Sequence, residues 1–229
     1  MFINWNVTAR FDPNSLVSST QGISTHGIPI PSYGNYGGPN YTAGVEGGTT
    51  PEGPNPTPAP VDALDTLFWQ HDLAYQQVKD GLVPPQDIPN AIAKADVTLV
   101  EGLYELLTTT NLAPEAFLYD ALATLTIGAK ILTTPSELDY LGANPSDAAA
   151  VFKAVQAAIP NFEIGLAETP GNEARSLNGA FHVFEARFAP LLTQAMASFG
   201  APSTPESSNI SPQVSETSQQ PLLTIPQYA

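Results

Sequence analysis

The sequence predicts a mainly α-helical protein, in which two antiparallel helices follow a glycine-rich loop and are continued by a C-terminal helical extension. Three observations predict this class. Apolar residues recur at helical spacing after residue 62, and glycine and proline concentrate in residues 31–60. Residues 1 to about 30 are weakly patterned, so we expect irregular structure there with one short strand. We expect a core at residues 1–110, a helical extension at 111–199, and a flexible tail rich in Pro, Ser and Gln at 200–229.

The region before the first helix is expected to be a loop. Residues 31–60 are dense in Gly, Pro, Asn and Thr, which favour turns. Within it, residues 44–60 resemble an extended insertion, because five prolines exclude regular structure there.

The first helix is predicted to begin at Asp62, which can serve as its N-cap, with Asp65 adding a favourable charge near the helix N-terminus. Gly81 is expected to end it. The spacings of three, four and seven residues place one line of side chains on the packed face: Leu64, Leu67, Phe68, His71, Ala74, Tyr75 and Val78.

The second helix is predicted from Pro85 or Gln86 to Thr108. Asp96 lies in the middle of its apolar stripe, where a carboxylate without a partner is costly. The connection between the two helices is short, so they should be antiparallel neighbours. Asp96 is then expected to face His71 or Tyr75.

Further helices are expected at residues 113–132, from Asn144 as N-cap to about Ile159, and at 172–199. The apolar stretch from Ala116 to Thr133 contains two charged residues, so it is interpreted as a helix packed against protein. An aromatic stripe is expected in the core, with a lipid-facing patch as the alternative: Phe181, Phe184 and Phe188.

Charge and composition exclude several classes of function. The net charge is −15, from 22 acidic against 7 basic residues, so no general basic surface is present to bind nucleic acid. Attraction to strongly anionic membranes is also weak, whereas divalent metals are easily accommodated. Without cysteine, neither a disulfide nor a thiolate metal site is possible.

The loop and the first two helices together suggest hydrolysis assisted by calcium. Glycines at 34, 37 and 38 can turn backbone carbonyls inward, and calcium takes six to eight oxygen ligands. Asp72 can reach a loop docked beside its helix. His71 can act as a general base, Asp96 is the candidate that orients it, and Tyr75 can hydrogen-bond the same carboxylate.

These residues resemble the calcium loop and active-site helix of the secreted phospholipase A2 superfamily, over roughly residues 30–105. The loop is similar to the family's Tyr-Gly-Cys-Tyr-Cys-Gly, with Asn35 and Gly37 at the two cysteine positions. The helix is similar to its His-Asp-x-Cys-Tyr motif, with Ala74 for cysteine. Together with Ala95-Asp96, it also resembles the cysteine-less phospholipase domains of parvoviral capsid proteins. Pro39, Asn40 and Tyr41 depart from the glycines that usually follow the loop.

The resemblance implies a calcium-dependent enzyme that hydrolyses the sn-2 ester of glycerophospholipids at a membrane surface. It implies His71 as the base, Asp96 as its orienting partner and Tyr75 as a support. Ca²⁺ would be held by Asp72 and by three loop carbonyls, and the N–H of Gly38 would help to stabilise the oxyanion. The three carbonyls are those of Tyr36, Gly38 and Asn40.

Several alternatives remain open at this point. The departures at residues 39–41 motivate a non-catalytic scaffold that binds lipid or protein, and a domain of a particle or toxin is a third possibility. A metal-dependent phosphohydrolase is disfavoured, because His26 and His182 lack ligand spacing and are interpreted as structural. The alternative for Asp96 is a merely structural role as the partner of Tyr75. We expect a secreted or particle-associated protein without a usual signal peptide, with a cytoplasmic protein as the alternative.

Overall fold

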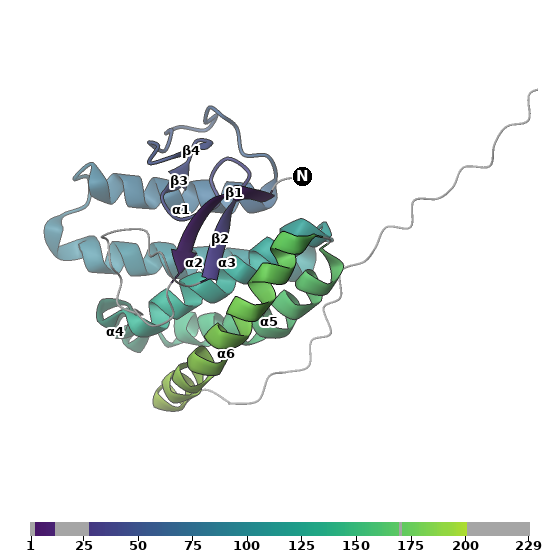
Figure 1. Cartoon of the computed structure of the whole chain (residues 1–229). Helices are drawn as coiled ribbons and strands as arrows, with labels where there is room; N and C mark the ends of the chain where they lie inside the picture. Colours follow the sequence, from purple (N-terminus) through teal and green to yellow (C-terminus); the bar gives the residue numbers. More distant parts are fainter. Residues whose placement is uncertain (1–2, 12–27, 170, 201–229) are drawn as a thin grey trace, which may run out of the picture.

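The computed structural model describes residues 3–11, 28–169 and 171–200, and these are mainly helical, as predicted (Figure 1). Six α-helices and two small antiparallel strand pairs make up the described part of the chain. The predicted tail, apart from Gly200, and His26 lie outside the described residues.

The N-terminal segment forms the longer strand pair. β1 (Ile3–Phe11) pairs with β2 (Ile28–Tyr33), with Ile3 opposite Tyr33 and an irregularity between Asn4 and Ala9. The described residues of this segment are more regular than the expected irregular structure with one short strand, because β1 has nine residues and β2 begins at Ile28. In the sequence, apolar residues alternate at positions 3, 5, 7, 9 and 11, which is the period of a strand and was a signal for it.

A second, very short hairpin follows the glycine-rich loop. β3 (Tyr41–Thr42) pairs with β4 (Val45–Glu46), so the expected insertion contributes one strand. Residues 47–62 then contain no helix or strand, which fits their proline content.

Helix α1 (Ala63–Lys79) has the predicted ends. The Asp62 side chain accepts a hydrogen bond from the backbone N–H of Asp65 at 2.8 Å. At the other end Gly81 has φ +72°, and the N–H groups of Gly81 and Leu82 donate to carbonyls of the last turn. This is the Schellman arrangement, in which glycine adopts the left-handed conformation without steric cost.

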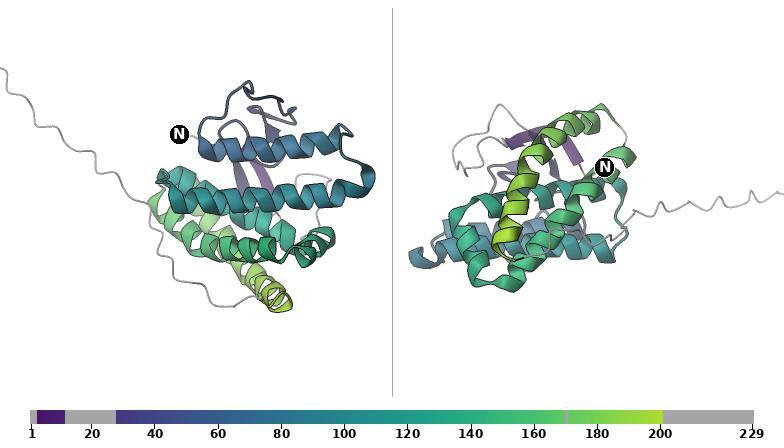
Figure 2. Two further views of the ribbon diagram at one scale, coloured as in Figure 1. Left: turned by 180° about the vertical axis from the view of Figure 1, so that it is seen from behind. Right: turned by 90° about the horizontal axis from the view of Figure 1, so that it is seen from below.

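A 3₁₀ turn (Pro85–Asp87) leads into α2 (Ile88–Thr109), close to the predicted second helix. Figure 2 shows α1 and α2 side by side, joined by a bend at one end, so they run antiparallel. Their facing surfaces bring the predicted site residues of the two helices together.

Helix α3 (Pro114–Thr133) is the central element of the fold. It contributes Tyr119 and Ala123 to one hydrophobic cluster, with β1, the loop, α1 and α2. It contributes Leu122 and Leu125 to a second cluster, with α2, α4, α5 and α6. By length and composition α3 could cross a membrane, but 83% of its most apolar window is buried inside the protein. The prediction of a helix packed against protein agrees with this burial.

Three further helices complete the extension: α4 (Pro135–Ala143), α5 (Pro145–Glu168) and α6 (Asn172–Ser198). Figure 1 shows α6 crossing the front of the molecule beside β2. The sequence did not predict α4, a nine-residue helix whose buried residues are Glu137 and Leu141. The aromatic stripe on α6 is buried, which supports its core interpretation: Phe181, Phe184 and Phe188.

Two expectations about α5 are wrong. The helix continues through Pro160 to Glu168 instead of ending near Ile159, because Phe162 and Gly165 hold the second half against the core. The Asn144 side chain does not cap α5. Its Nδ2 donates instead to the carbonyl of Tyr140 at 2.8 Å, at the end of α4.

Candidate active site

Helices α1 and α2 bring a histidine, a carboxylate and a tyrosine into direct contact. His71 and Tyr75 lie one turn apart on α1 and both face Asp96 on α2, which is fully buried. His71 Nε2 lies 2.6 Å from Asp96 Oδ1, and the Tyr75 hydroxyl donates to both Asp96 oxygens, at 2.8 and 3.0 Å. An ionised carboxylate only accepts, so Nε2 carries the proton in this pair and Nδ1 is left as the basic nitrogen.

The structure adds a lysine and a glutamate to this pair, and sequence reasoning missed both. Lys130 on α3 donates to Asp96 Oδ2 and, at 2.5 Å, to Glu137 Oε1 on α4. Its Nζ also lies 5.8 Å from the centre of the Tyr75 ring. The available signal was a lone cation inside an apolar helix, which needs a buried partner.

The charges of this cluster shift the pKa values of its members. Burial lowers the pKa of His71, but the hydrogen bond with Asp96 and the nearby carboxylate of Asp72 outweigh burial and raise it to about 9, so the ring is mostly protonated at neutral pH and Nδ1 becomes basic as the pH rises. Burial raises the pKa of Asp96, while His71 and Lys130 lower it, so that it falls below its usual value. Burial and the charge of Asp96 raise the pKa of Glu137 to about 7, against the effect of Lys130.

Asp72 lies beside His71 and has an oxygen without a hydrogen-bond partner. Its Oδ1 is 3.9 Å from His71 Nδ1, and its Oδ2 is buried and bonds to no group among the described residues. Burial raises the pKa of Asp72, whereas the nearby donor groups of His71 and Thr42 lower it. A buried carboxylate oxygen with no donor is costly, so this position suits a proton or a cation.

The glycine-rich loop is fastened to α1 by Asp65. Its carboxylate accepts hydrogen bonds from the backbone N–H groups of Asn35 and Tyr36, at 2.8–3.1 Å, and from Val61 at 2.9 Å. The sequence assigned Asp65 only a charge effect on the helix. The structure corrects this, because Asp65 fixes the conformation of the loop. A side chain at Gly34 would place its Cβ 2.4 Å from the Asp65 carboxyl carbon.

The predicted loop ligands lie on this fastened segment. The carbonyl of Gly38 accepts from the N–H of Tyr41 at 3.2 Å, and that of Asn40 accepts from the N–H of Gly47 at 2.7 Å. The N–H of Gly38 donates to no group within the described ranges. The Tyr36 phenol has its pKa raised by burial and by the charges of Asp65 and Asp72, so the loop lies within the field of the Asp72 carboxylate.

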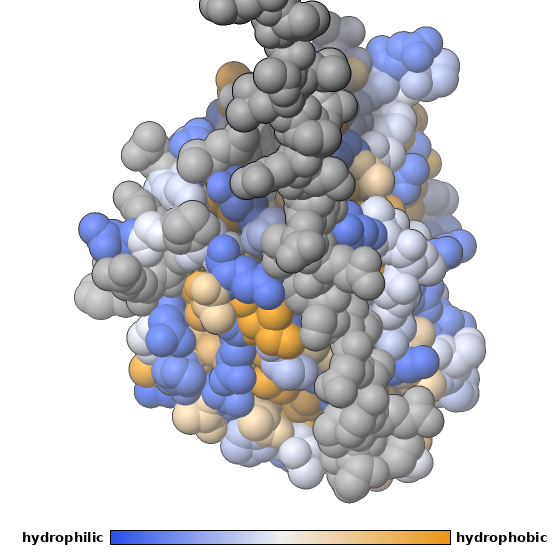
Figure 3. Space-filling view, turned by 90° about the vertical axis from the view of Figure 1, so that its right-hand side faces the viewer, coloured by the Kyte–Doolittle hydropathy of each residue, from blue (hydrophilic) through white to orange (hydrophobic). Residues whose placement is uncertain are grey.

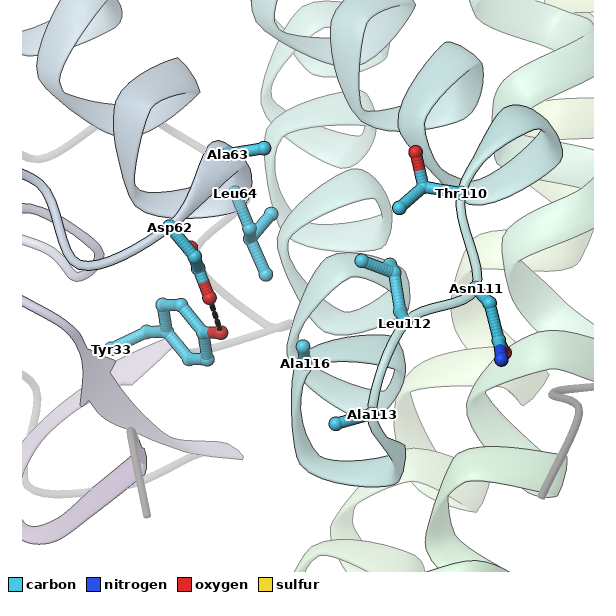
Figure 4. A pocket seen from close by; sticks show the side chains of 9 residues that line it. All are labelled: Tyr33, Asp62, Ala63, Leu64, Thr110, Asn111, Leu112, Ala113 and Ala116. Atoms are coloured by element: carbon cyan, nitrogen blue, oxygen red, sulfur yellow. Dashed lines mark hydrogen bonds between the residues drawn. The ribbon is translucent and has the colours of Figure 1, made fainter. Parts of the chain in front are cut away.

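A small pocket lies elsewhere, between the start of α1, the end of α2 and the start of α3. Its volume is about 220 Å³, and the Tyr33 hydroxyl donates to Asp62 at its wall, at 2.5 Å (Figure 4). Figure 3, which views the side of the molecule where α1 begins, shows apolar residues gathered in one area. His71 lies about two turns further along α1 than Leu64 and does not line this pocket. Its lining residues are Tyr33, Asp62, Ala63, Leu64, Thr110, Asn111, Leu112, Ala113 and Ala116.

One exposed group on α5 and α6 has the composition of a metal site. Ligand atoms of Glu163, His182 and Glu185 lie within 4.8 Å of one another. His182 Nδ1 is 3.6 Å from Glu185 Oε2, one helical turn away. All three are on the surface or partly exposed, where acidic groups of this kind commonly pair without a metal.

Comparisons of the chain with protein-family models, with curated proteins and with solved structures gave no match.

Proposed function

We propose that this protein is a calcium-dependent phospholipase A2 that hydrolyses the sn-2 ester of glycerophospholipids. One observation carries the proposal: the 2.6 Å contact between His71 Nε2 and the buried Asp96, which leaves Nδ1 as the base beside Asp72. The loop motif and the His71-Asp72 motif of the superfamily both support this interpretation, since they lie in the order that the resemblance requires, with the insertion at residues 44–60 between them.

In the proposed reaction the neutral form of His71, whose share grows as the pH rises toward its pKa of about 9, takes a proton at Nδ1 from a water molecule, whose oxygen then bonds to the ester carbonyl carbon. Asp96 stabilises the resulting imidazolium through the Nε2 hydrogen bond, and Tyr75 keeps the carboxylate in place. When the bond from carbon to the glycerol oxygen breaks, His71 returns the proton to that oxygen. The products are a fatty acid and a lysophospholipid.

The residues present fit a bound calcium ion. Asp72 has a buried oxygen without a partner, and the carbonyls of Tyr36, Gly38 and Asn40 would supply the neutral ligands. A carbonyl oxygen has two lone pairs, so the hydrogen bonds that Gly38 and Asn40 already accept leave a second one on each. When bound, calcium would polarise the ester carbonyl, and the N–H of Gly38 is available to the oxyanion.

The same loop also favours a second candidate, a non-catalytic scaffold that binds lipid or a protein partner. The hydrogen bonds accepted by the carbonyls of Gly38 and Asn40 are the specific observation for it, because they compete with a metal for these oxygens. The two candidates differ in one respect that can be measured, which is turnover.

The proposed substrate implies a transient contact with a phospholipid surface. A net charge of −15 gives little attraction to strongly anionic lipid, so we propose zwitterionic phospholipid as the better surface. Nucleic acid is not proposed as a partner. We propose a secreted or particle-associated protein, since its substrate is membrane lipid.

The test is fatty-acid release from mixed phospholipid vesicles labelled in the sn-2 chain, with calcium and with excess chelator. The variants are His71→Gln and, as a matched control, His182→Gln, which changes an exposed histidine on α6. We expect release that needs calcium, is lost in His71→Gln and is kept in His182→Gln. Full activity of His71→Gln would refute the proposal, and calcium binding without release by the wild type would favour the scaffold.

A further inference from the structure

Lys130 is the one described cation that contacts the His71–Asp96 pair, and the proposed reaction does not use it. It comes from α3, outside the segment that carries the family resemblance. Its side chain is 26% exposed, while those of Asp96 and Glu137, which it joins, are 0% and 1% exposed. The ammonium group of Lys130 is thus the group by which the helical extension, residues 111–199, contacts the His71–Asp96 pair.

The three charges form a chain from α2 through α3 to α4. Asp96 and Glu137 are both acidic and nearly inaccessible to water, and Lys130 lies between them as their shared donor. Two buried carboxylates without this cation would repel each other, and one of them would take up a proton. Glu137 Oε2 has no partner in the described chain, so Glu137 depends on Lys130 for its compensation.

Each oxygen of Asp96 has a different task in this arrangement. Oδ1 accepts from His71 Nε2, whereas Oδ2 accepts from Lys130, and Tyr75 bridges the two. Lys130 therefore fixes the rotation of the carboxylate and keeps it ionised. A protonated Asp96 would donate to Nε2, which would move the ring proton to Nδ1 and remove the base.

We propose that Lys130 is a positioning residue that holds Asp96 ionised and oriented toward His71, and that Glu137 anchors Lys130. The expected effect of Lys130 on turnover rests on the proposed function. The expected effect of Lys130 on the position of the proton on the His71 ring does not depend on turnover. The proposed function and the role of Lys130 can therefore be tested separately.

The variant is Lys130→Met, which keeps the length of the side chain and removes the ammonium group. Lys153→Met is the matched control, because Lys153 on α5 also lies near a tyrosine of α2, with Nζ 5.4 Å from the ring centre of Tyr104. Lys153 is exposed, Tyr104 is half-buried, and neither belongs to the cluster around Asp96. Calcium affinity is measured in both variants by calcium titration, to exclude damage to the loop.

Two readouts are taken. The first is steady-state release of fatty acid from the vesicles. We expect Lys130→Met to lower kcat by about 10–100-fold with KM unchanged, because a displaced orienting group impairs the chemical step without impairing binding. The second is the ¹⁵N–¹H spectrum of the histidine rings. The chain has only three histidines, and His71→Gln assigns the one of interest.

We expect a downfield Nε2–H signal from His71 in the wild type and in Lys153→Met, and its loss or exchange with an Nδ1–H signal in Lys130→Met. Retention of both kcat and the Nε2–H signal in a folded Lys130→Met would overturn the inference while leaving the proposed hydrolysis intact. If the wild type releases no fatty acid, the proposed function fails, and the ring spectra alone decide the role of Lys130.

Glu137→Gln serves if Lys130→Met does not fold, because it keeps Lys130 and its donors. With Glu137 neutral, Lys130 loses its charged anchor and holds Asp96 less firmly in the orientation that faces His71. We expect a several-fold lower kcat and an upfield shift of the Nε2–H signal. An unchanged kcat and an unchanged ring spectrum would overturn the inference.

Discussion

The anchor of the loop, Asp65, offers the sharpest test of the local structure. In Asp65→Asn one carboxylate oxygen becomes an NH₂ group. In the wild type, Oδ2 of Asp65 accepts from the N–H groups of Asn35 and Val61, and Oδ1 accepts from those of Tyr36 and Asn35. Whichever way the amide turns, at least one backbone N–H faces another donor, and the remaining hydrogen bonds lose their charge.

The expected cost follows from these contacts. An unsatisfied buried donor costs about 1–3 kcal/mol, and each hydrogen bond that loses its charged acceptor about 1 kcal/mol more. Burial raises the pKa of Asp65 despite its backbone donors, so desolvation offsets part of the gain in the wild type. We therefore expect a loss of about 3 kcal/mol in the free energy of unfolding. For a chain of this size that lowers Tm by about 6–12 °C.

Urea unfolding at neutral pH, followed by circular dichroism, measures this change. Asp87→Asn is the control, because Asp87 is exposed at the start of α2 and makes no side-chain cap hydrogen bond. It should change stability by less than about 0.5 kcal/mol. An Asp65→Asn variant with the unfolding midpoint of the wild type would show that Asp65 does not hold the loop.

Three further predictions concern burial, close packing and the metal. Burial raises the pKa of Asp120 well above its usual value, so its stabilising contribution is complete below about pH 4 and is lost as the pH rises toward the folded-state pKa. Asp120→Asn should therefore be more stable than the wild type by about 1–3 kcal/mol at pH 7, and the gain should vanish near pH 4 in urea titrations. Gly165→Ala should lower the free energy of unfolding by about 1–2 kcal/mol, because its Cβ would lie 2.8 Å from the Cα of Leu118. A Cβ at Gly179 meets nothing within 4 Å, so Gly179→Ala should raise the free energy of unfolding by up to about 1 kcal/mol. Equal unfolding midpoints for the two variants would contradict this prediction. Calcium at about 100 times its Kd should stabilise the wild type by about 2.7 kcal/mol, reversibly by chelator, and should leave the Tm of Asp72→Asn unchanged.

The helices could be predicted where the sequence carries local signals. Asp62 and Gly81 mark the ends of α1 by capping, which depends only on nearby backbone groups. Pro160 gave the opposite result, because packing of the following turn against α3 outweighs the local cost of proline. Local rules therefore predict helix ends well only where tertiary contacts do not oppose them.

The candidate site divides in the same way. The contact of His71 with Asp96 follows from two helix periodicities and a short connection, all of which are visible in the sequence. The contacts of Lys130 with Asp96 and Glu137 cannot be predicted in this way, because they depend on how α3 and α4 pack against α2. A lone charged residue in an apolar helix indicates that a partner exists, but only the tertiary structure identifies it.

The position of α3 has a consequence for how the molecule comes apart. Tyr119 packs against the rings of Tyr33 and Phe68 and donates to the carbonyl of Pro31, while Leu122 and Leu125 on the same helix belong to the other cluster. Both hydrophobic clusters lose buried residues if α3 detaches. We expect the two clusters to melt in one cooperative transition, so that a fragment ending before α3 would expose its core and be digested by proteases.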